Sequence, residues 1–566
     1  MRAFKSISDY ATDDVIIRLL AKERGKFAVK NTGRTERGDD MYINQLKPKM
    51  PPHSIWRNPG KNRRPKSGKN LHGIALWTRD KKLSTSRVYV TILKELKNGT
   101  NAQWAQNLRS FLDRIHGILD ERIELKFEAP VVIPKFKDHN EDKGVFIYRP
   151  ICSYTNLETK ILLTLTYNYL LYCFDDCFHR NMLFMRSARK MANGYWKSPN
   201  YIDAIRITDE YRKRNNDKTI FVGECDIQKF YDIFNHDDIL DCFEKLFEVK
   251  KKQQNNLDDK DFDPIRRIVR AYLDSYDYAR NVMGLNDLDD FWKIERCNHM
   301  KKGYSNPVCR FQWVSEESFV ESGCYASVQE FRRARDEGKI GIPQGGALSG
   351  MMVNVVMNEI DRGIVEPHDP GRLFVRYCDD ILLMHTNRHK CEQYLDYYIN
   401  ALKEHKLVPH KLEHVSKTKH GVKTGSRFWH VKSKHVFHWG PGAGDSSDWI
   451  GFVGFEMRRT GEIRLRKDKV NQEAKRIART YHSVIKSQNP SERINSFNSL
   501  AKHIRDYEMI TIDRYTLAQA KRLDNYLKTK VAQASKKTRT PQLEDIHTYR
   551  HELKEKKREG ILSSIS

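Results

Sequence analysis

The feature of this sequence that most restricts its fold is a short apolar run that leads to two adjacent aspartates and resumes directly after them. The apolar residues 373–375 lead to Asp379 and Asp380, and the apolar residues 381–384 follow. Short apolar runs of this length, separated by polar turn residues, are typical of β-strands. The pattern therefore predicts two strands joined by an acidic turn.

A further acidic residue, Asp226, follows another predicted strand at 220–222. A strand end is a rigid place from which to direct a carboxylate into a cleft, and Mg²⁺ prefers such oxygen ligands. Two Mg²⁺ ions about 3.5–4 Å apart can activate an attacking hydroxyl and stabilise the leaving oxygen of a phosphoryl displacement. Asp226 and Asp379 thus allow a two-metal polymerase or nuclease, although aspartates at turns commonly serve only to cap the turn.

The charge of the chain indicates a polyanionic partner. Its 566 residues include 101 Lys and Arg against 74 Asp and Glu, which gives a formal net charge of +27. A surplus of this size on a folded chain favours binding to nucleic acid, with a basic solvated surface as the alternative. Because 39% of the residues are hydrophobic and Pro and Gly are sparse, the composition is that of a folded protein.

Membrane insertion and secretion are not expected. The uncharged stretch 161–174 is too short to span a bilayer, and 340–358 is interrupted by polar residues and glycines. The first 18 residues mix charges without an apolar core, and the ten cysteines lack the paired spacing of a disulfide scaffold. We therefore expect a cytoplasmic protein with no membrane partner.

Further elements are predicted on both sides of the acidic motifs. Residues 131–150 indicate a β-hairpin that carries Lys135, Lys137 and Arg149, and helical periodicity precedes and follows it. A second hairpin is expected over 449–465, and basic helices follow it. Part of the stretch between Asp226 and Asp379 is expected to be an insertion.

Five segments, in this order along the chain, resemble the motifs of reverse transcriptases. They are 147–151 (IYRPI), 226–236 (DIQKFYDIFNH), 341–350 (GIPQGGALSG), 376–380 (RYCDD) and 450–455 (IGFVGF). The resemblance is to the bacterial branch that includes retron, group II intron and defence-associated (abortive-infection type) enzymes. It departs from that pattern at Cys378, because alanine or methionine is commoner before the paired aspartates.

The resemblance implies an α+β fold, namely a right-hand polymerase with an antiparallel palm sheet and a helical amino-terminal extension and thumb. The expected parts are a basic, largely helical extension (1–125), fingers (126–218), a palm (219–465) with an insertion at about 243–338, and a basic, helical thumb and tail (466–566).

The resemblance also implies roles for the acidic motifs. Asp226, Asp379 and Asp380 would be catalytic. Asp226, Asp379 and the backbone carbonyl of Ile227 would bind two Mg²⁺ ions, for which Mn²⁺ could substitute. Tyr231 would lie under the sugar of the incoming nucleotide and exclude a 2′-hydroxyl, which favours DNA synthesis over RNA synthesis.

Other residues would bind the nucleotide. Preorganised cations stabilise the charge that moves to a leaving pyrophosphate, and a glycine allows the backbone to approach a base pair closely. The residues in these roles would be Lys135, Lys137 and Arg149 for the triphosphate, and Gln344 and Gly345 for the base pair. The lysine expected beside the nucleotide after the acidic turn is either Lys411 or Lys417.

The function implied is RNA-directed DNA polymerase activity that adds dNTPs to a DNA product on an RNA template. Because no mobility machinery is evident, an antiphage defence system with an associated non-coding RNA is the expected setting, and a homo-oligomer is one option. Two alternatives stay open. One is template-independent or protein-primed DNA synthesis by the same site, and the other is a maturase-like RNA-binding protein that uses the motifs as a scaffold.

Overall fold

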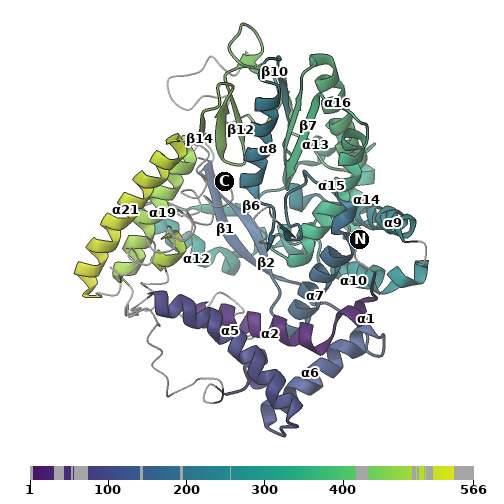
Figure 1. Cartoon of the computed structure of the whole chain (residues 1–566), viewed down its shortest axis with the longest axis vertical. Helices are drawn as coiled ribbons and strands as arrows, with labels where there is room; N and C mark the ends of the chain where they lie inside the picture. The colour runs from purple at the N-terminus through teal and green to yellow at the C-terminus, as the bar shows by residue number, and fades with distance from the viewer. Residues whose placement is uncertain are drawn as a thin grey trace.

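The structure is a computed structural model, and it describes residues 4–30, 44–52, 55, 74–140, 144–190, 196–254, 257–415, 431–486, 493, 496–501, 504, 514–540 and 543. The fold mixes helices and sheets, as the sequence predicts (Figure 1). Among the helices of these residues, none has both the length and the hydropathy that a bilayer span requires.

Helices make up the amino-terminal part of the described chain. They are α1 (Ile7–Tyr10), α2 (Asp13–Lys30), α5 (Ile74–Lys97) and α6 (Gln103–Leu119). Figure 1 shows α2, α5 and α6 grouped at one end of the molecule. α6 is amphipathic, because Trp104, Leu108, Leu112 and Ile115 recur at helical spacing and are all buried. Its burial against the preceding helices joins this part to the main core.

A three-stranded sheet follows, and it contains the hairpin that the sequence predicts. β1 (Val131–Asn140) pairs antiparallel with β2 (Val145–Ser153), with a bulge between Phe136 and Asp138. β6 (Val308–Phe311) then adds to β2 in parallel. α12 (Asp289–Met300) packs against the same sheet through the fully buried Trp292. The stretch 243–338, expected as an insertion, therefore supplies both a strand and a covering helix to this sheet.

A six-stranded sheet, which we call the central sheet, lies between two large hydrophobic cores. Its order is β11–β10–β5–β8–β7, and the short strand β9 pairs with β10. The strands are β5 (Phe221–Glu224), β7 (Arg372–Tyr377), β8 (Asp380–His385), β9 (Leu412–Glu413), β10 (Ser433–Trp439) and β11 (Ser446–Ser447). β5, β7 and β8 pair antiparallel, and they are the strands that the apolar runs predict.

Both faces of the central sheet are covered. On β8, Ile381 and Leu383 point into one hydrophobic core, whereas Leu382 and Met384 point into another. Because alternate residues of a strand face opposite sides, burial of both faces requires a continuous apolar run. This explains why residues 381–384 do not alternate with polar residues.

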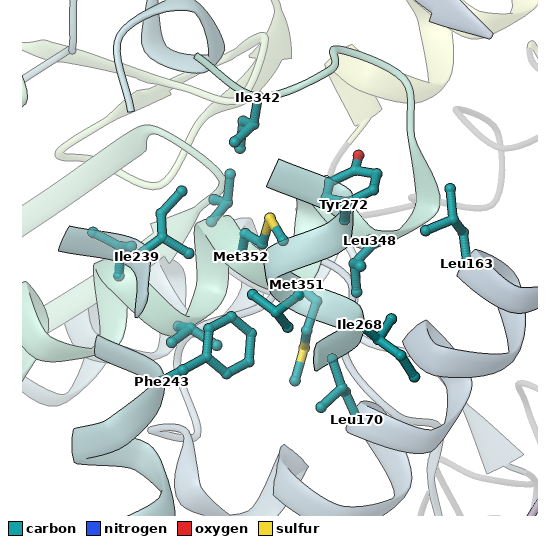
Figure 2. Close-up of a cluster of buried hydrophobic side chains, with 14 of the residues drawn as sticks. Leu163, Leu170, Ile239, Phe243, Ile268, Tyr272, Ile342, Leu348, Met351 and Met352 are labelled. Atoms are coloured by element: carbon teal, nitrogen blue, oxygen red, sulfur yellow. The ribbon is translucent and has the colours of Figure 1, made fainter. Parts of the chain in front are cut away.

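One face of the sheet is covered by a helical layer whose core is drawn in Figure 2. Its main helices are α7 (Leu157–Phe174), α9 (His236–Gln253), α10 (Asp263–Asp274), α15 (Ala347–Val365) and α16 (Arg388–Glu404). Leu170 of α7, Phe243 of α9, Ile268 of α10 and Met351 of α15 lie together in this core (Figure 2). Shorter helices complete the layer, namely α11 (Tyr278–Asn281), α13 (Glu316–Glu321) and α14 (Val328–Asp336).

The other face is covered by α8 (Tyr201–Arg214), a small sheet and the carboxyl-terminal helices. The small sheet consists of β12 (Trp449–Phe452), β13 (Phe455–Arg458) and β14 (Ile463–Leu465), which confirms the predicted second hairpin. α19 (Lys467–Lys486) and α21 (Arg514–Thr538) follow, and they lie side by side along one flank in Figure 1. A two-stranded ribbon, β3 (Arg189–Lys190) and β4 (Trp196–Lys197), precedes α8.

Candidate active site

The paired aspartates lie at the tight turn between β7 and β8. Tyr377 pairs with Asp380 across the hairpin, so that Cys378 and Asp379 form the turn itself. Cys378 has a φ of 63°, a left-handed conformation that two-residue hairpin turns require. The guanidinium of Arg376 donates a hydrogen bond to the Cys378 carbonyl at 3.2 Å. Arg376 of β7 therefore stabilises the turn that carries Asp379.

Asp226 reaches the same place from β5. The register of β5 and β8 pairs Phe221 with His385 and Gly223 with Leu383, so the chain beyond β5 runs toward the β7–β8 turn. Two hydrogen bonds fix the backbone of Asp226. Its N–H donates to Ser433 Oγ at 2.9 Å, and its carbonyl accepts from the N–H of His410 at 2.9 Å.

Asp226, Asp379 and Asp380 interact electrostatically. Desolvation, and then the charge of Asp226, raise the pKa of Asp379 above its usual range. Desolvation by the surrounding protein, and then the charges of Asp379 and Asp226, also raise the pKa of Asp380, although part of this residue is exposed. The site is a group of mutually repelling carboxylates, of which Asp380 is exposed to solvent and Asp226 is buried, and a bound cation would relieve that repulsion.

Ile227 directly follows Asp226 and has a backbone carbonyl that the neighbouring segment 408–410 does not use. Residues 226–228 form a short antiparallel bridge with 408–410, in which the Gln228 N–H donates to the Val408 carbonyl at 2.8 Å. Because the residues on either side of Ile227 make the bonds of this bridge, its own N–H and carbonyl point away from it. The N–H of Ile227 contacts Asp226 Oδ1 at 3.0 Å. The donor set around Asp226 and Asp379 is thus all oxygen, which fits Mg²⁺.

Lys432 lies against the carboxylates, and our sequence analysis missed it. Its Nζ is 2.8 Å from Asp226 Oδ2. Desolvation lowers the pKa of Lys432, but Asp226, Asp380 and Asp379 outweigh it and raise the pKa above the usual value. Of the two lysines predicted for this region, Lys411 is exposed and Lys417 lies outside the described residues. Lys432 directly precedes β10, so the sequence could have identified it as a partner of Asp226 only if the pairing of β10 with β5 had been known.

The cations of the β1–β2 hairpin lie close to one another, and Lys137 interacts with Lys432 beside the carboxylates. Lys135 is the cross-strand partner of Arg149, and Lys137 is the extra residue at the bulge. Partial desolvation and the positive charges of Arg149 and Lys432 lower the pKa of Lys137. The interaction with Lys432 places the bulge near the carboxylates. The structure therefore brings the three predicted cations together on one side of the hairpin.

Lys229 joins this group of cations and was not predicted. It has a φ of 48°, and it lies three residues after Asp226 in the turn that leads to α9. Burial, and then the charges of Lys137 and Arg149, act to lower its pKa, while Asp232 acts in the opposite direction. Its place within the first acidic motif was the available signal.

Tyr231 contacts the acidic turn from the side. Its hydroxyl lies 3.6 Å from Cys378 Sγ, and burial raises the pKa of that hydroxyl. Gln344 and Gly345 lie at the end of β2 instead. The Gln344 carbonyl accepts a hydrogen bond from the Cys152 N–H at 2.8 Å, and Gly345 is exposed with a φ of 102°. Both residues therefore contact the end of β2.

Carboxylates at the ends of neighbouring antiparallel strands, facing a group of cations, define a site suited to phosphoryl transfer. Residues 300–455 match the family model described as reverse transcriptase (RNA-dependent DNA polymerase). The chain thus contains a reverse transcriptase domain, and it is an RNA-directed DNA polymerase. The match includes the β7–β8 turn with Asp379 and Asp380 and begins after Asp226.

Several solved telomerase structures are similar to the chain at 12% sequence identity. The structure of telomerase from Candida tropicalis in complex with a TWJ fragment of telomeric RNA has a TM-score of 0.34, with 88% of this chain and 74% of that chain covered. Apo telomerase from the same organism has a TM-score of 0.34, with 98% and 91% covered. The Candida albicans telomerase complex with that RNA fragment has a TM-score of 0.31, with 85% and 73% covered. No curated protein sequence matches the chain.

Proposed function

We propose that this enzyme extends DNA on an RNA template with dNTPs, through two Mg²⁺ ions held by the carboxylates of the central sheet. The observation that carries the proposal is the strand register that brings Asp226, just after β5, beside Asp379 and Asp380 of the β7–β8 turn, where their negative charges repel one another. In this proposal the central sheet is the palm, the β1–β2 hairpin belongs to the fingers, and α19 with α21 forms the thumb.

Asp226, Asp379 and the carbonyl of Ile227 would hold the ions, and Asp380 would add negative charge. The bound ions would activate the attacking hydroxyl and stabilise the leaving oxygen. The backbone bonds of Asp226 to Ser433 and His410 keep its carboxylate in place. Lys432 offsets part of the repulsion among the acids and has to leave Asp226 when an ion binds.

The cations of the hairpin would bind the triphosphate. Lys137 interacts electrostatically with Lys432 beside the carboxylates, Lys135 and Arg149 lie next to Lys137 on the hairpin, and Lys229 adds a fourth positive charge. Charge moves toward the β- and γ-phosphates as pyrophosphate leaves, so cations fixed before the reaction lower the barrier. Half-buried Gln344 and exposed Gly345 would contact the base pair beside the end of β2.

Tyr231 would select the sugar. Its ring lies beside the acidic turn, where its hydroxyl contacts Cys378 Sγ at 3.6 Å. A ring held there leaves no room for a 2′-hydroxyl, so deoxynucleotides would be preferred.

We place this activity in an antiphage defence system that includes a small non-coding RNA. The support is the resemblance of the five motifs to the bacterial branch with defence-associated enzymes and the net charge of +27. The RNA would serve as template, and the DNA product would stay bound to the basic surface.

The first test is primer extension on an RNA template with the purified full chain and an Asp379→Asn/Asp380→Asn double variant. We expect wild-type incorporation of dNTPs and a loss of at least about a thousandfold in the variant, since a metal-centred site supplies several kcal/mol of charge stabilisation. An Asp336→Asn variant, changed at an exposed position of α14, is the control and should retain activity. Incorporation that persists in the double variant would contradict the proposed site.

The second test is sequencing of the DNA and RNA that purify with the protein from cells. DNA that is complementary to the bound RNA supports templated synthesis. A homopolymer or simple repeat without a complement, or DNA joined covalently to the chain, contradicts the templated part and supports the untemplated or protein-primed alternative. Protection against phage that survives in the double variant would instead support the maturase-like alternative.

A further inference from the structure

A second group of possible metal ligands does not include Asp226, Asp379 or Asp380. Asp238 and Cys242 are one turn apart on α9, so they share a face of that helix, and His405 directly follows α16. Their three ligand atoms all lie within 4.8 Å of one another. Among the described residues, this is the one group of three or more His, Cys, Asp or Glu side chains with that property.

The distances within this group are close to those of a tetrahedral metal site. His405 Nδ1 lies 3.7 Å from Cys242 Sγ and 2.8 Å from Asp238 Oδ1. Zinc bonds of about 2.3 Å to sulfur and about 2.0–2.2 Å to nitrogen and oxygen imply ligand separations of about 3.4–3.6 Å in a tetrahedron. The cysteine and histidine already have that spacing, and the aspartate needs to move away from the histidine by about 0.6 Å.

The surroundings of the group also suit a cation. The Cys242 side chain is fully buried, whereas the side chains of Asp238 and His405 are 18% and 12% exposed. The second carboxylate oxygen of Asp238, Oδ2, is buried and has no hydrogen-bond partner within the described part of the chain. A buried carboxylate oxygen without a partner costs free energy, which a neighbouring cation would offset. Asp238 and His405 are the two members of the group that solvent reaches.

We propose that Asp238, Cys242 and His405 bind one zinc ion, with water as the fourth ligand. The mixture of oxygen, sulfur and nitrogen donors favours Zn²⁺, because Mg²⁺ binds almost entirely through oxygen. The Cys242 thiol would lose its proton to solvent as the Zn–S bond forms, and the histidine would bind through its neutral Nδ1. In the metal-free protein the same residues form only a hydrogen-bonded His405–Asp238 pair beside a buried thiol.

The site would act on the structure of the catalytic region rather than on the reaction. The chain from Asp226 to Asp238 and the chain from His405 to His410 meet twice near Asp226, where His410 and Gln228 make backbone hydrogen bonds of 2.9 Å and 2.8 Å. A zinc ion would join the same two chain segments a few residues further on. The proposal does not depend on polymerase activity.

The test uses the purified full chain, loaded with Zn²⁺ and dialysed against metal-free buffer, with metal content measured by mass spectrometry. We expect about one zinc per wild-type chain. Cys242→Ser and His405→Gln should each lower zinc affinity by at least about tenfold to a hundredfold, since even residues that only support ligands have effects of that size. Cys391→Ser replaces a buried cysteine of α16 that contacts the Phe221 carbonyl, and this control should keep the zinc.

Two further measurements distinguish loss of the site from misfolding. The Co²⁺-loaded wild type should show a thiolate-to-cobalt absorption band in the near ultraviolet that Cys242→Ser lacks. A zinc chelator, added with excess Mg²⁺, should lower the Tm of the wild type and leave that of Cys242→Ser unchanged. A wild type that takes up no zinc, or a thiolate band that persists in Cys242→Ser, overturns the proposal and leaves an ordinary His–Asp pair between two helices.

Discussion

At the scale of single residues, Lys432 is the counter-ion of the carboxylates of Asp226, Asp379 and Asp380. Its positive charge lowers the pKa values of Asp379 and Asp380, which desolvation and mutual repulsion raise. Metal binding requires these carboxylates to be deprotonated. Activity should therefore fall as the pH decreases through their raised pKa values.

We predict that Lys432→Gln moves the acidic limb of the pH–activity profile to higher pH. Removal of the positive charge raises the carboxylate pKa values further, by up to about one unit, so that protonation inhibits the enzyme at a higher pH. The measurement is kcat against pH at saturating Mg²⁺ for wild type and variant. Lys301→Gln, which changes an exposed lysine at the end of α12, is the control and should leave the limb in place. An unchanged acidic limb in Lys432→Gln would show that this lysine is electrostatically unimportant.

The residues of the site differ in how far the sequence alone could identify them. Asp226, Asp379 and Asp380 each follow a local apolar run, so their places at strand ends could be predicted. Lys432 could not, because its contact with Asp226 depends on the pairing of β10 with β5 across about two hundred residues. Lys229 lay within a recognised motif, but its approach to the hairpin depends on how the three-stranded sheet is placed.

At the scale of elements, local hairpins were predictable and long-range pairings were not. The β1–β2 hairpin and the β13–β14 hairpin appear where the sequence places them, because their partners are adjacent in the chain. β6 pairs in parallel with β2 from a stretch that we expected to be an insertion. Its four residues carry no signal that identifies their partner, since a parallel pair has no connecting turn to fix its register.

The link between α15 and β7 leads to a prediction about stability. Arg376 and Asp361 form a fully buried ion pair at 2.7 Å, and the same guanidinium also donates to the Cys378 carbonyl of the acidic turn. Removal of one partner leaves the other charge buried and uncompensated, which typically costs about 3–5 kcal/mol. Asp361→Ala should therefore lower the free energy of unfolding by about that amount, as measured by urea denaturation.

A matched change on the surface provides the control for this prediction. Glu366 forms an i,i+4 pair with Arg362 just after α15, and its side chain is 60% exposed. Exposed pairs of this kind contribute about 0–1 kcal/mol, so Glu366→Ala should be nearly neutral. If Asp361→Ala were equally neutral, the buried pair would not be what holds the acidic turn on α15.

At the scale of the whole molecule, the hydrophobic cores on the two faces of the central sheet meet at that sheet. Basic side chains line a cavity nearby. A cavity of about 750 Å³ lies where β13 and β14 meet the start of α19, and its lining includes Arg464, Arg466, Lys467, Lys469 and Arg522. Arg466 also lowers the pKa of Asp380, so this basic cavity lies near the carboxylate of Asp380. The sequence indicated a nucleic-acid partner from net charge alone, but it could not show that these cations come together, since β14, α19 and α21 contribute them separately.

This arrangement predicts that the cations of the cavity bind the phosphates of a nucleic-acid duplex. Each phosphate contact releases condensed counterions, so log Kd should change with log salt concentration by about 0.7–0.9 per contact. A Lys469→Ala/Arg522→Ala double variant should weaken binding of an RNA–DNA duplex and reduce the salt slope by about 1–2. Fluorescence anisotropy at several salt concentrations measures both quantities.

The control is a Lys301→Ala/Lys302→Ala double variant, which removes the same charge from the exposed turn after α12. It should leave the slope unchanged, because α12 covers the three-stranded sheet and does not line the cavity. Equal slopes for the two double variants would mean that net charge, rather than the basic cavity, determines how this enzyme holds nucleic acid.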